Sequence, residues 1–238
     1  MALGLVFMSL LLSWHALAKL DFLYPVWYSA LAIGDHISHY GALNRTGRQD
    51  FVLTGPEEHR RLFGAVVDGI HGRGIPLDQL VYRDRDGNVL GGFLRAEEVG
   101  HLRDVGALVD KLLLAGWSVT ALTVILVLLH GRRGLCLPSL ARALLGYGIL
   151  LGLTGVVVGV IGPQQVFDGL HEWIFASGHP WFFYYQDSLM TTVMKAPDIF
   201  AAILLTWLVL HLVLFAFLLA VLRHLSSMSF FTHPTEQP

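Results

Sequence analysis

The sequence predicts an all-α membrane protein with four transmembrane helices, a small extracytoplasmic cap and an interfacial helix before the last span. Of its 238 residues, 54% are hydrophobic and 14% are charged, whereas a soluble domain has about 25% charged residues. The mean hydropathy is +0.59. The apolar residues also form runs near the roughly 20 residues that a membrane span needs. We therefore treat residues 1–238 as a single membrane domain.

Three apolar runs have the length of a span: residues 112–129, 140–161 and 199–222. A fourth run, residues 3–18, is shorter, and Ala16-Leu17-Ala18 resembles the cleavage site of a secretory signal. No basic segment precedes that run, as one would in a signal peptide. We therefore expect residues 3–18 to remain as a helix, although cleavage would leave the later spans where they are.

Charge asymmetry orients the spans. Basic residues near span ends mark the cytoplasmic side, and this chain has Arg132, Arg133, Arg142 and Arg223 there. The acidic segment 163–198 and the segment 20–110 then lie outside the plasma (cytoplasmic) membrane. The net charge of −2 and the lack of a long basic run argue against a nucleic-acid partner. The single cysteine, Cys136, cannot form an internal disulfide and falls on the cytoplasmic side.

The outer segment 20–110 predicts a compact, mostly helical cap. Apolar residues recur at helical spacing after Pro56, and proline and acids suit the first turn of a helix. Asp86-Gly87 lies between two short apolar runs and predicts one β-hairpin. From Ala96, apolar residues at helical spacing predict a helix that continues into the second span and carries His101 in its first turns.

The second outer loop, residues 163–198, is rich in aromatic residues, which favour the headgroup level of a membrane. Phe167, Leu170 and Ile174 define one face of a short interfacial helix, with His171 beside it. We expect this segment to lie along the outer leaflet. The tail, residues 226–238, reads as disordered.

Two of the 12 histidines, His101 and His171, are predicted to meet at the outer face although they are far apart in the sequence. Such a pair suggests a shared site, and the alternative is two interfacial histidines bonded to headgroups or backbone. His36 and His39 have a spacing that can place two metal ligands on one helical face, although a polar surface is the alternative. His211 lies within a span, where an interhelical hydrogen bond is the expected role.

Several motifs in order resemble the lipoprotein intramolecular transacylase (Lit) family over nearly the whole chain. They are Glu-Glu-x-x-His-Leu-x-Asp-Val at residues 97–105, the region 40–51 with Asn44-Arg45, His59-x-x-Leu-Phe63, and the segment 167–197 with Trp181. The family's two essential histidines match His101 and His171. The resemblance implies that an acyl chain moves from the glyceryl sn-2 oxygen of a diacylated lipoprotein to the α-amine of its N-terminal cysteine.

Such a reaction needs proton transfer and no enzyme nucleophile or cofactor, and histidine suits proton transfer at neutral pH. We expect His101 to act as the base and His171 as the acid, or the reverse. Asp104 is a candidate to orient His101 and is otherwise a helix N-terminal acid. Asn44 and Arg45 are candidates for contacts with an oxyanion or a headgroup, because amide and guanidinium donors suit developing negative charge, and a plain loop role is the alternative. Tyr40 and Trp181 are further candidates for substrate contact.

The expected partners are the diacylated lipoprotein and membrane lipid, and we expect a monomer. The sequence lacks the Gly-x-Ser-x-Gly motif of a serine hydrolase, a P-loop and a dinucleotide fingerprint. Two other classes of function remain open. One is a metal- or haem-binding membrane protein that uses the outer histidines as ligands, and the other is a non-catalytic membrane scaffold.

Overall fold

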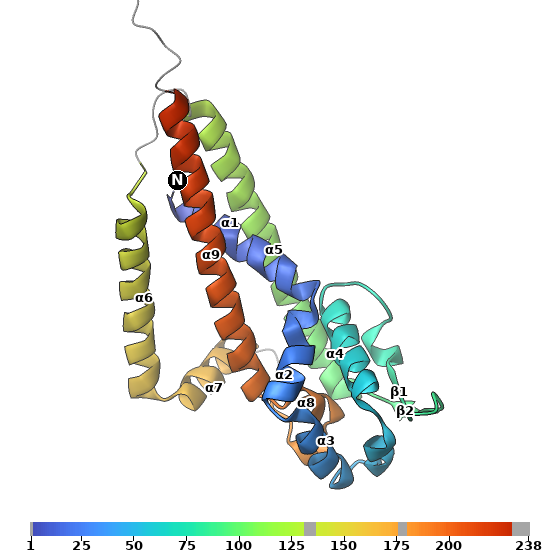
Figure 1. Ribbon diagram of the computed structural model, residues 1–238. Helices are drawn as coiled ribbons and strands as arrows, with labels where there is room; N and C mark the ends of the chain where they lie inside the picture. The colour runs from blue at the N-terminus through green and yellow to red at the C-terminus, as the bar shows by residue number, and fades with distance from the viewer. Residues whose placement is uncertain (1, 131–136, 176–179, 230–238) are drawn as a thin grey trace, which may run out of the picture. The chain divides into compact units, whose positions relative to one another are not determined.

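The computed structural model describes residues 2–130, 137–175 and 180–229, and its elements are labelled in Figure 1. Arg132, Arg133, Cys136 and His179 lie outside the described residues. The α-helices are α1 (Ala2–Ala18), α2 (Tyr24–Ala30), α3 (Ile33–Ala42), α4 (Pro56–Ile70), α5 (Ala96–His130), α6 (Leu140–Ile161), α7 (Pro163–Ile174), α8 (Leu189–Met194) and α9 (Asp198–Ser229). Short 3-10 turns are η1 (Asp21–Leu23), η2 (Gln49–Leu53), η3 (Leu77–Gln79) and η5 (Tyr185–Asp187), and the strands are β1 (Val81–Arg83) and β2 (Val89–Gly92).

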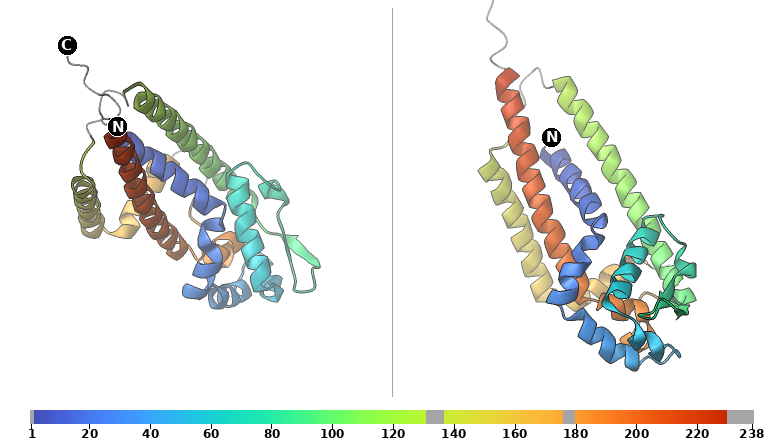
Figure 2. Two further views of the ribbon diagram at one scale, coloured as in Figure 1. Left: turned by 45° about the horizontal axis from the view of Figure 1, so that its top comes forward. Right: turned by 45° about the vertical axis from the view of Figure 1, so that its right-hand side comes forward.

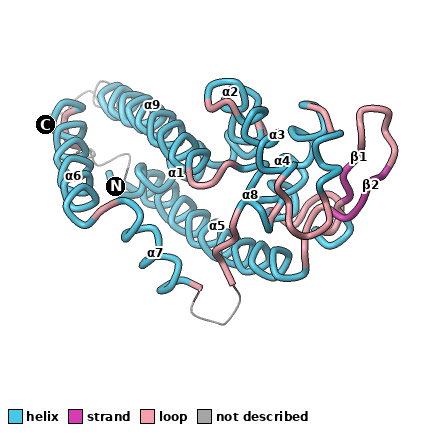
Figure 3. Tube along the Cα trace, turned by 90° about the horizontal axis from the view of Figure 1, so that it is seen from below, coloured by secondary structure: helices cyan, strands magenta, loops and turns pink. Residues whose placement is uncertain are grey.

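Three helices among the described residues are long and apolar enough to cross a membrane: α5, α6 and α9. The chain is therefore a multi-pass membrane protein. Its structure is mostly helical, as the cyan tube in Figure 3 shows. The predicted run 112–129 is the later part of α5, whose start at Ala96 agrees with the sequence expectation. Helix α9 continues to Ser229, so residues 226–229 of the predicted disordered tail are helical, and the rest of the tail lies outside the described residues.

The fourth predicted span is not a straight helix of full length. Helix α1 has 17 residues, and it counts as a span only together with the segment Asp21–Ala30, from which it is bent by 78°. The break contains Asp21, Phe22 and Leu23, which have positive φ angles of 46°, 49° and 59°. Left-handed backbone is unfavourable for residues with a Cβ and cannot continue a right-handed helix. The helix therefore ends before this turn.

The chain divides into two compact units, and the first contains residues 1–15, 113–170 and 207–238. Its described part contains all of α6 and portions of α1, α5, α7 and α9. Leu5, Phe215 and Leu219 form a buried apolar cluster. His211 of α9 is fully buried, with Ser9 of α1 3.0 Å from its Nδ1 and Tyr147 of α6 2.5 Å from its Nε2. This places His211 in the interhelical role expected for a polar residue within a membrane.

The second unit contains residues 16–112 and 171–206. Its core includes α8, in which all but one residue are buried, and α8 contacts both α3 and α4. The hydroxyl of Tyr24 donates to the carbonyl oxygen of Val193 in α8 at 2.7 Å. The sequence expectation placed the whole segment 163–198 along the outer leaflet, and this is wrong for α8, because its apolar residues fill the protein core.

Helix α4 begins at Pro56, as predicted, and buries its apolar face, with Leu62, Phe63 and Val66 almost fully covered. It lies beside the two-stranded sheet in Figure 2. Strands β1 and β2 are antiparallel, and Gly87 in the connecting loop has a φ of 89°. The predicted hairpin is therefore present, although its loop is longer than a two-residue turn. The Asp84 carboxylate organises this loop by accepting hydrogen bonds from the backbone N–H groups of Asp86 and Asn88.

Candidate functional site

The second unit brings His101 and His171 together. His101 lies near the start of α5 and His171 near the end of α7, and their ring centroids are 6.4 Å apart. His101 is 9% exposed, whereas His171 is half-buried. At this separation, a substrate group of a few atoms can contact both imidazoles within hydrogen-bonding distance. The two residues that the sequence selected as a pair are thus neighbours in space.

Aromatic rings surround the two imidazoles. The ring of Phe175 lies 5.2 Å from that of His101 and 5.5 Å from that of His171. Phe183 is 6.2 Å from His101, and Trp181 is 4.9 Å from His171. Rings at these distances shield the imidazoles from water and offer an apolar surface to a hydrocarbon chain. The lower local dielectric constant also strengthens electrostatic interactions at the site.

A charged pair lies at the start of the helix that carries His101. Glu98 is fully buried and precedes His101 by three residues, so both lie on the same side of α5. Its Oε2 accepts a hydrogen bond from the backbone N–H of Arg95 at 2.6 Å, as the glutamate of a capping box does. Its Oε1 lies 3.6 Å from Nε of Arg95 in an ion pair. The Arg95 guanidinium carbon is 5.7 Å from the centre of the Phe183 ring, which also neighbours His101.

Asn44 and Arg48 extend this polar cluster. Asn44 is 2% exposed, and its Oδ1 accepts hydrogen bonds from the backbone N–H groups of Thr46 and Arg48 at 2.9 and 3.1 Å. The Arg48 guanidinium donates to the carbonyl oxygen of Phe93 at 2.9 Å. Burial lowers the pKa of Arg48, and the charge of Glu98 opposes this effect. Arg48 therefore joins the loop of Asn44 to the region just before α5.

The other predicted site residues are distributed differently. Arg45 is exposed, and its backbone N–H donates to the carbonyl oxygen of Gln186 at 2.7 Å. Tyr40 is half-buried in a separate aromatic cluster, 4.7 Å from Tyr185. Asp104 is half-buried, one helical turn after His101. Of the adjacent pair Asn44 and Arg45, only Asn44 is buried, and it belongs to the polar cluster with Arg48.

Sequence reasoning missed several residues around the histidines: Arg48, Arg95, Glu98, Phe175 and Phe183. The position of Glu98 three residues before His101 was a usable signal, because residues at this spacing are neighbours on a helix. The role of Arg48 had no local signal. Its contact with Phe93 joins residues 45 positions apart in the chain.

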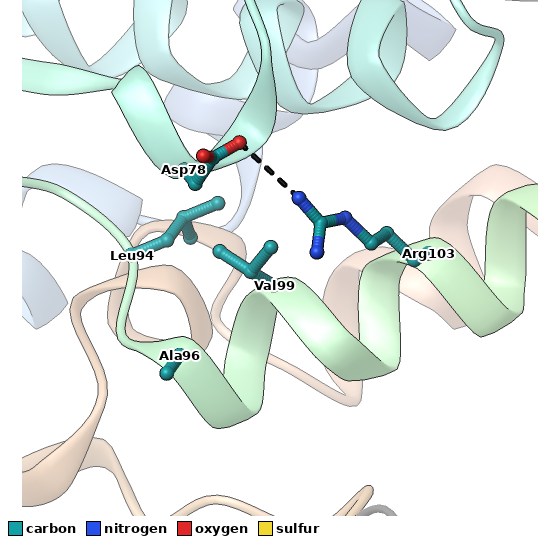
Figure 4. Close-up of a pocket in the computed structure, with 5 residues that line it drawn as sticks. All are labelled: Asp78, Leu94, Ala96, Val99 and Arg103. Atoms are coloured by element: carbon teal, nitrogen blue, oxygen red, sulfur yellow. Dashed lines mark hydrogen bonds and ion pairs between the residues drawn. The ribbon is translucent and has the colours of Figure 1, made fainter.

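A pocket also lies at the start of α5, and Figure 4 shows its lining. It is lined by Asp78, Leu94, Ala96, Val99 and Arg103. Arg103 and Asp78 form an exposed ion pair of 3.3 Å there. With about 3.6 residues per helical turn, Val99 and Arg103 project from the side of α5 opposite to Glu98 and His101. The pocket is therefore distinct from the histidine pair.

The histidines considered as metal ligands pack against aromatic rings. His36 lies 4.6 Å from Tyr40 and 4.4 Å from Tyr185, and His39 lies 4.8 Å from Tyr40. Within residues 2–130, 137–175 and 180–229, no group of three or more His, Cys, Asp or Glu side chains is arranged to hold a metal ion.

No protein-family model, curated protein or solved structure matches this chain.

Proposed function

We propose that this protein is an intramolecular acyltransferase that acts on diacylated lipoproteins at the extracytoplasmic face of the plasma membrane. The observation that carries the proposal is the proximity of His101 and His171, whose rings are 6.4 Å apart within an aromatic surround. The resemblance of the sequence motifs to the transacylase family supplies the substrate class. The many apolar residues of the chain suit a location in the membrane, where a lipid-linked substrate is also found.

The reaction joins two groups of one substrate molecule. The α-amine nitrogen attacks the carbonyl carbon of the sn-2 ester, and a C–N bond forms while the carbonyl oxygen gains negative charge. The C–O bond to the glyceryl oxygen then breaks, which leaves an amide on the amine and a free hydroxyl on the glyceryl group. Because amine and ester belong to one molecule, holding them in contact makes the step unimolecular and supplies much of the acceleration.

Two proton transfers remain for the protein. An α-amine has a pKa of about 7.7 to 8.0 and is partly protonated at neutral pH, so a base must free its lone pair. We assign this role to His101, which is the more buried of the two histidines. His171, which is half-buried, then donates a proton to the departing glyceryl oxygen. The reverse assignment uses the same geometry, and histidine serves both roles near neutral pH.

The test uses purified protein in detergent and a synthetic lipopeptide with a diacylglyceryl cysteine at its N-terminus. Mass spectrometry distinguishes the two acyl positions after fragmentation, because transfer keeps the mass constant and moves one chain to the amine. We expect wild-type protein to produce the N-acylated, lyso-form peptide. His101→Asn and His171→Asn should each slow this reaction by at least about a hundredfold, the usual contribution of a general acid or base.

His71→Asn is the matched control, because His71 is a helix-capping residue whose Nδ1 lies 2.7 Å from the carbonyl oxygen of Val67. It should transfer the acyl chain at the wild-type rate. Full activity of a folded His101→Asn protein would refute the assignment, and absence of transfer by folded wild-type protein would refute the proposed function.

A further inference from the structure

The polar cluster beside the histidine pair contains buried donors that make no hydrogen bond. They are Nδ2 of Asn44, Nη2 of Arg48 and Nε of Arg95. Oε1 of Glu98 also makes none, although it lies 3.6 Å from the Arg95 Nε. A buried polar group without a hydrogen bond is energetically unfavourable. Folded proteins contain few such groups, and water or a ligand often satisfies them.

These atoms belong to one connected cluster. Asn44 accepts a hydrogen bond from the backbone of Arg48, and the Arg48 guanidinium interacts electrostatically with both Glu98 and Arg95. Glu98 in turn bonds to the backbone of Arg95. Arg95 Nε and Glu98 Oε1 face each other in an ion pair of 3.6 Å, which is longer than a hydrogen bond. The donors therefore outnumber the acceptors, and the cluster suits a ligand atom that accepts hydrogen bonds. A carbonyl oxygen is such an acceptor, and it binds donors more strongly when it carries negative charge.

Arg95 connects this cluster to the proposed reaction centre. Its guanidinium and the imidazole of His101 both pack against the Phe183 ring, at 5.7 and 6.2 Å. Glu98 lies on the side of α5 that also carries His101. Arg95 and Glu98 thus link the donors of the cluster to the side of α5 that carries His101, which is opposite to the pocket at Asp78 and Arg103.

We propose that Asn44, Arg48 and Arg95 bind the carbonyl oxygen of the substrate's sn-2 ester and stabilise the negative charge that develops on it. The proposal rests on the proposed acyltransferase function. As the amine adds to the carbonyl carbon, the oxygen becomes an oxyanion. The charge returns to a C=O bond when the bond to the glyceryl oxygen breaks. Preorganised donors of this kind act mainly in the transition state, so they raise kcat more than they tighten substrate binding.

Two substitutions test the proposal: the first keeps the known structural contacts, whereas the second also removes the ion pair of Arg95 with Glu98 and its contact with the Phe183 ring. Asn44→Asp keeps the Oδ1 acceptor that bonds to the backbone of Thr46 and Arg48, and it replaces only the free amide donor. Arg95→Gln removes the guanidinium and leaves the backbone N–H that bonds to Glu98. Arg48 is less suitable, because its side chain also donates to the carbonyl oxygens of Gly92 and Phe93.

The assay measures kcat and KM for acyl transfer with the synthetic diacylglyceryl lipopeptide. We expect each substitution to lower kcat by about a hundredfold, the usual effect of losing one oxyanion donor, with a much smaller change in KM. Gln79→Glu, an exposed amide-to-carboxylate change, and Arg103→Gln, in the pocket on the opposite side of α5, should keep the wild-type kcat. Thermal unfolding midpoints identify variants that fold.

If both substituted proteins fold and keep the wild-type kcat, the oxyanion role is wrong. A rise in KM at constant kcat also overturns it, because the donors would then bind the ground state alone. If only one of the two folds, its kcat decides between these outcomes. If neither folds, Arg95→Lys, which keeps the charge and removes the planar guanidinium, replaces them. Absence of transfer by wild-type protein instead refutes the acyltransferase function, and the oxyanion role falls with it.

Discussion

His59 makes the stability of the second unit dependent on pH. The side chain is 5% exposed and lies between two hydroxyl groups, with Thr54 Oγ1 2.6 Å from its Nε2 and Tyr28 OH 2.9 Å from its Nδ1. Because Thr54 donates its only hydroxyl proton to the carbonyl oxygen of Phe51, its oxygen accepts from Nε2–H of His59. Tyr28 then donates to Nδ1. These hydrogen bonds suit a neutral imidazole, because a proton on Nδ1 would require the Tyr28 hydroxyl to stop donating and accept instead.

Burial accordingly lowers the pKa of His59 from its ordinary 6.5 to about 4. The free-energy equivalent of this difference is roughly 3 kcal/mol. Since the folded state disfavours the proton, the stabilisation is complete above the unfolded-state pKa of about 6.5 and is lost as the pH falls towards 4. We therefore expect protonation of His59 alone to lower the free energy of unfolding of wild-type protein, by up to this amount, as the pH falls over this interval.

The assay compares wild-type protein with His59→Gln, which keeps a polar side chain and does not titrate. Thermal unfolding in detergent at several pH values from 7.5 to 4 should show a steeper loss of stability in wild-type protein than in the variant. A proton NMR titration of the folded protein should place the His59 pKa well below 6.5. The reasoning is refuted if the imidazole titrates near 6.5, or if both proteins lose stability equally as the pH falls.

Three further predictions concern the membrane part and the site. His211→Leu should lower the free energy of unfolding by about 1 kcal/mol, because the bonding partners on Ser9 and Tyr147 are lost; an unchanged unfolding midpoint would argue against this role. Trp181→Ala should raise KM, because the ring beside His171 would no longer cover the acyl chain, and a variant with wild-type KM would contradict that contact. Dialysis against a chelator should leave acyl transfer unchanged, whereas an activity lost on dialysis and restored by a metal ion would favour the metal-binding alternative.

Local patterns in the sequence determined much of the secondary structure. Apolar runs predicted helices α5, α6 and α9, and the proline, acids and helical periodicity after residue 56 predicted α4. The Asp86-Gly87 dipeptide predicted the β-hairpin. These features were accessible because hydrophobic periodicity and turn preferences depend on residues that are close in the chain. The same dependence on local patterns explains why the prediction for α8 was wrong. Its few apolar residues are equally compatible with a segment at the membrane surface and with one in the protein core.

Only the tertiary structure decided which polar residues are buried together. His59 belongs to a motif that the sequence shows, but its burial follows from the folded structure, in which it lies between Tyr28 and Thr54. The cluster of Asn44, Arg48 and Glu98 likewise joins distant parts of the chain. The sequence specified the residues available for such contacts, but burial and charge pairing depend on which helices and loops pack against one another, and a local pattern does not contain that information.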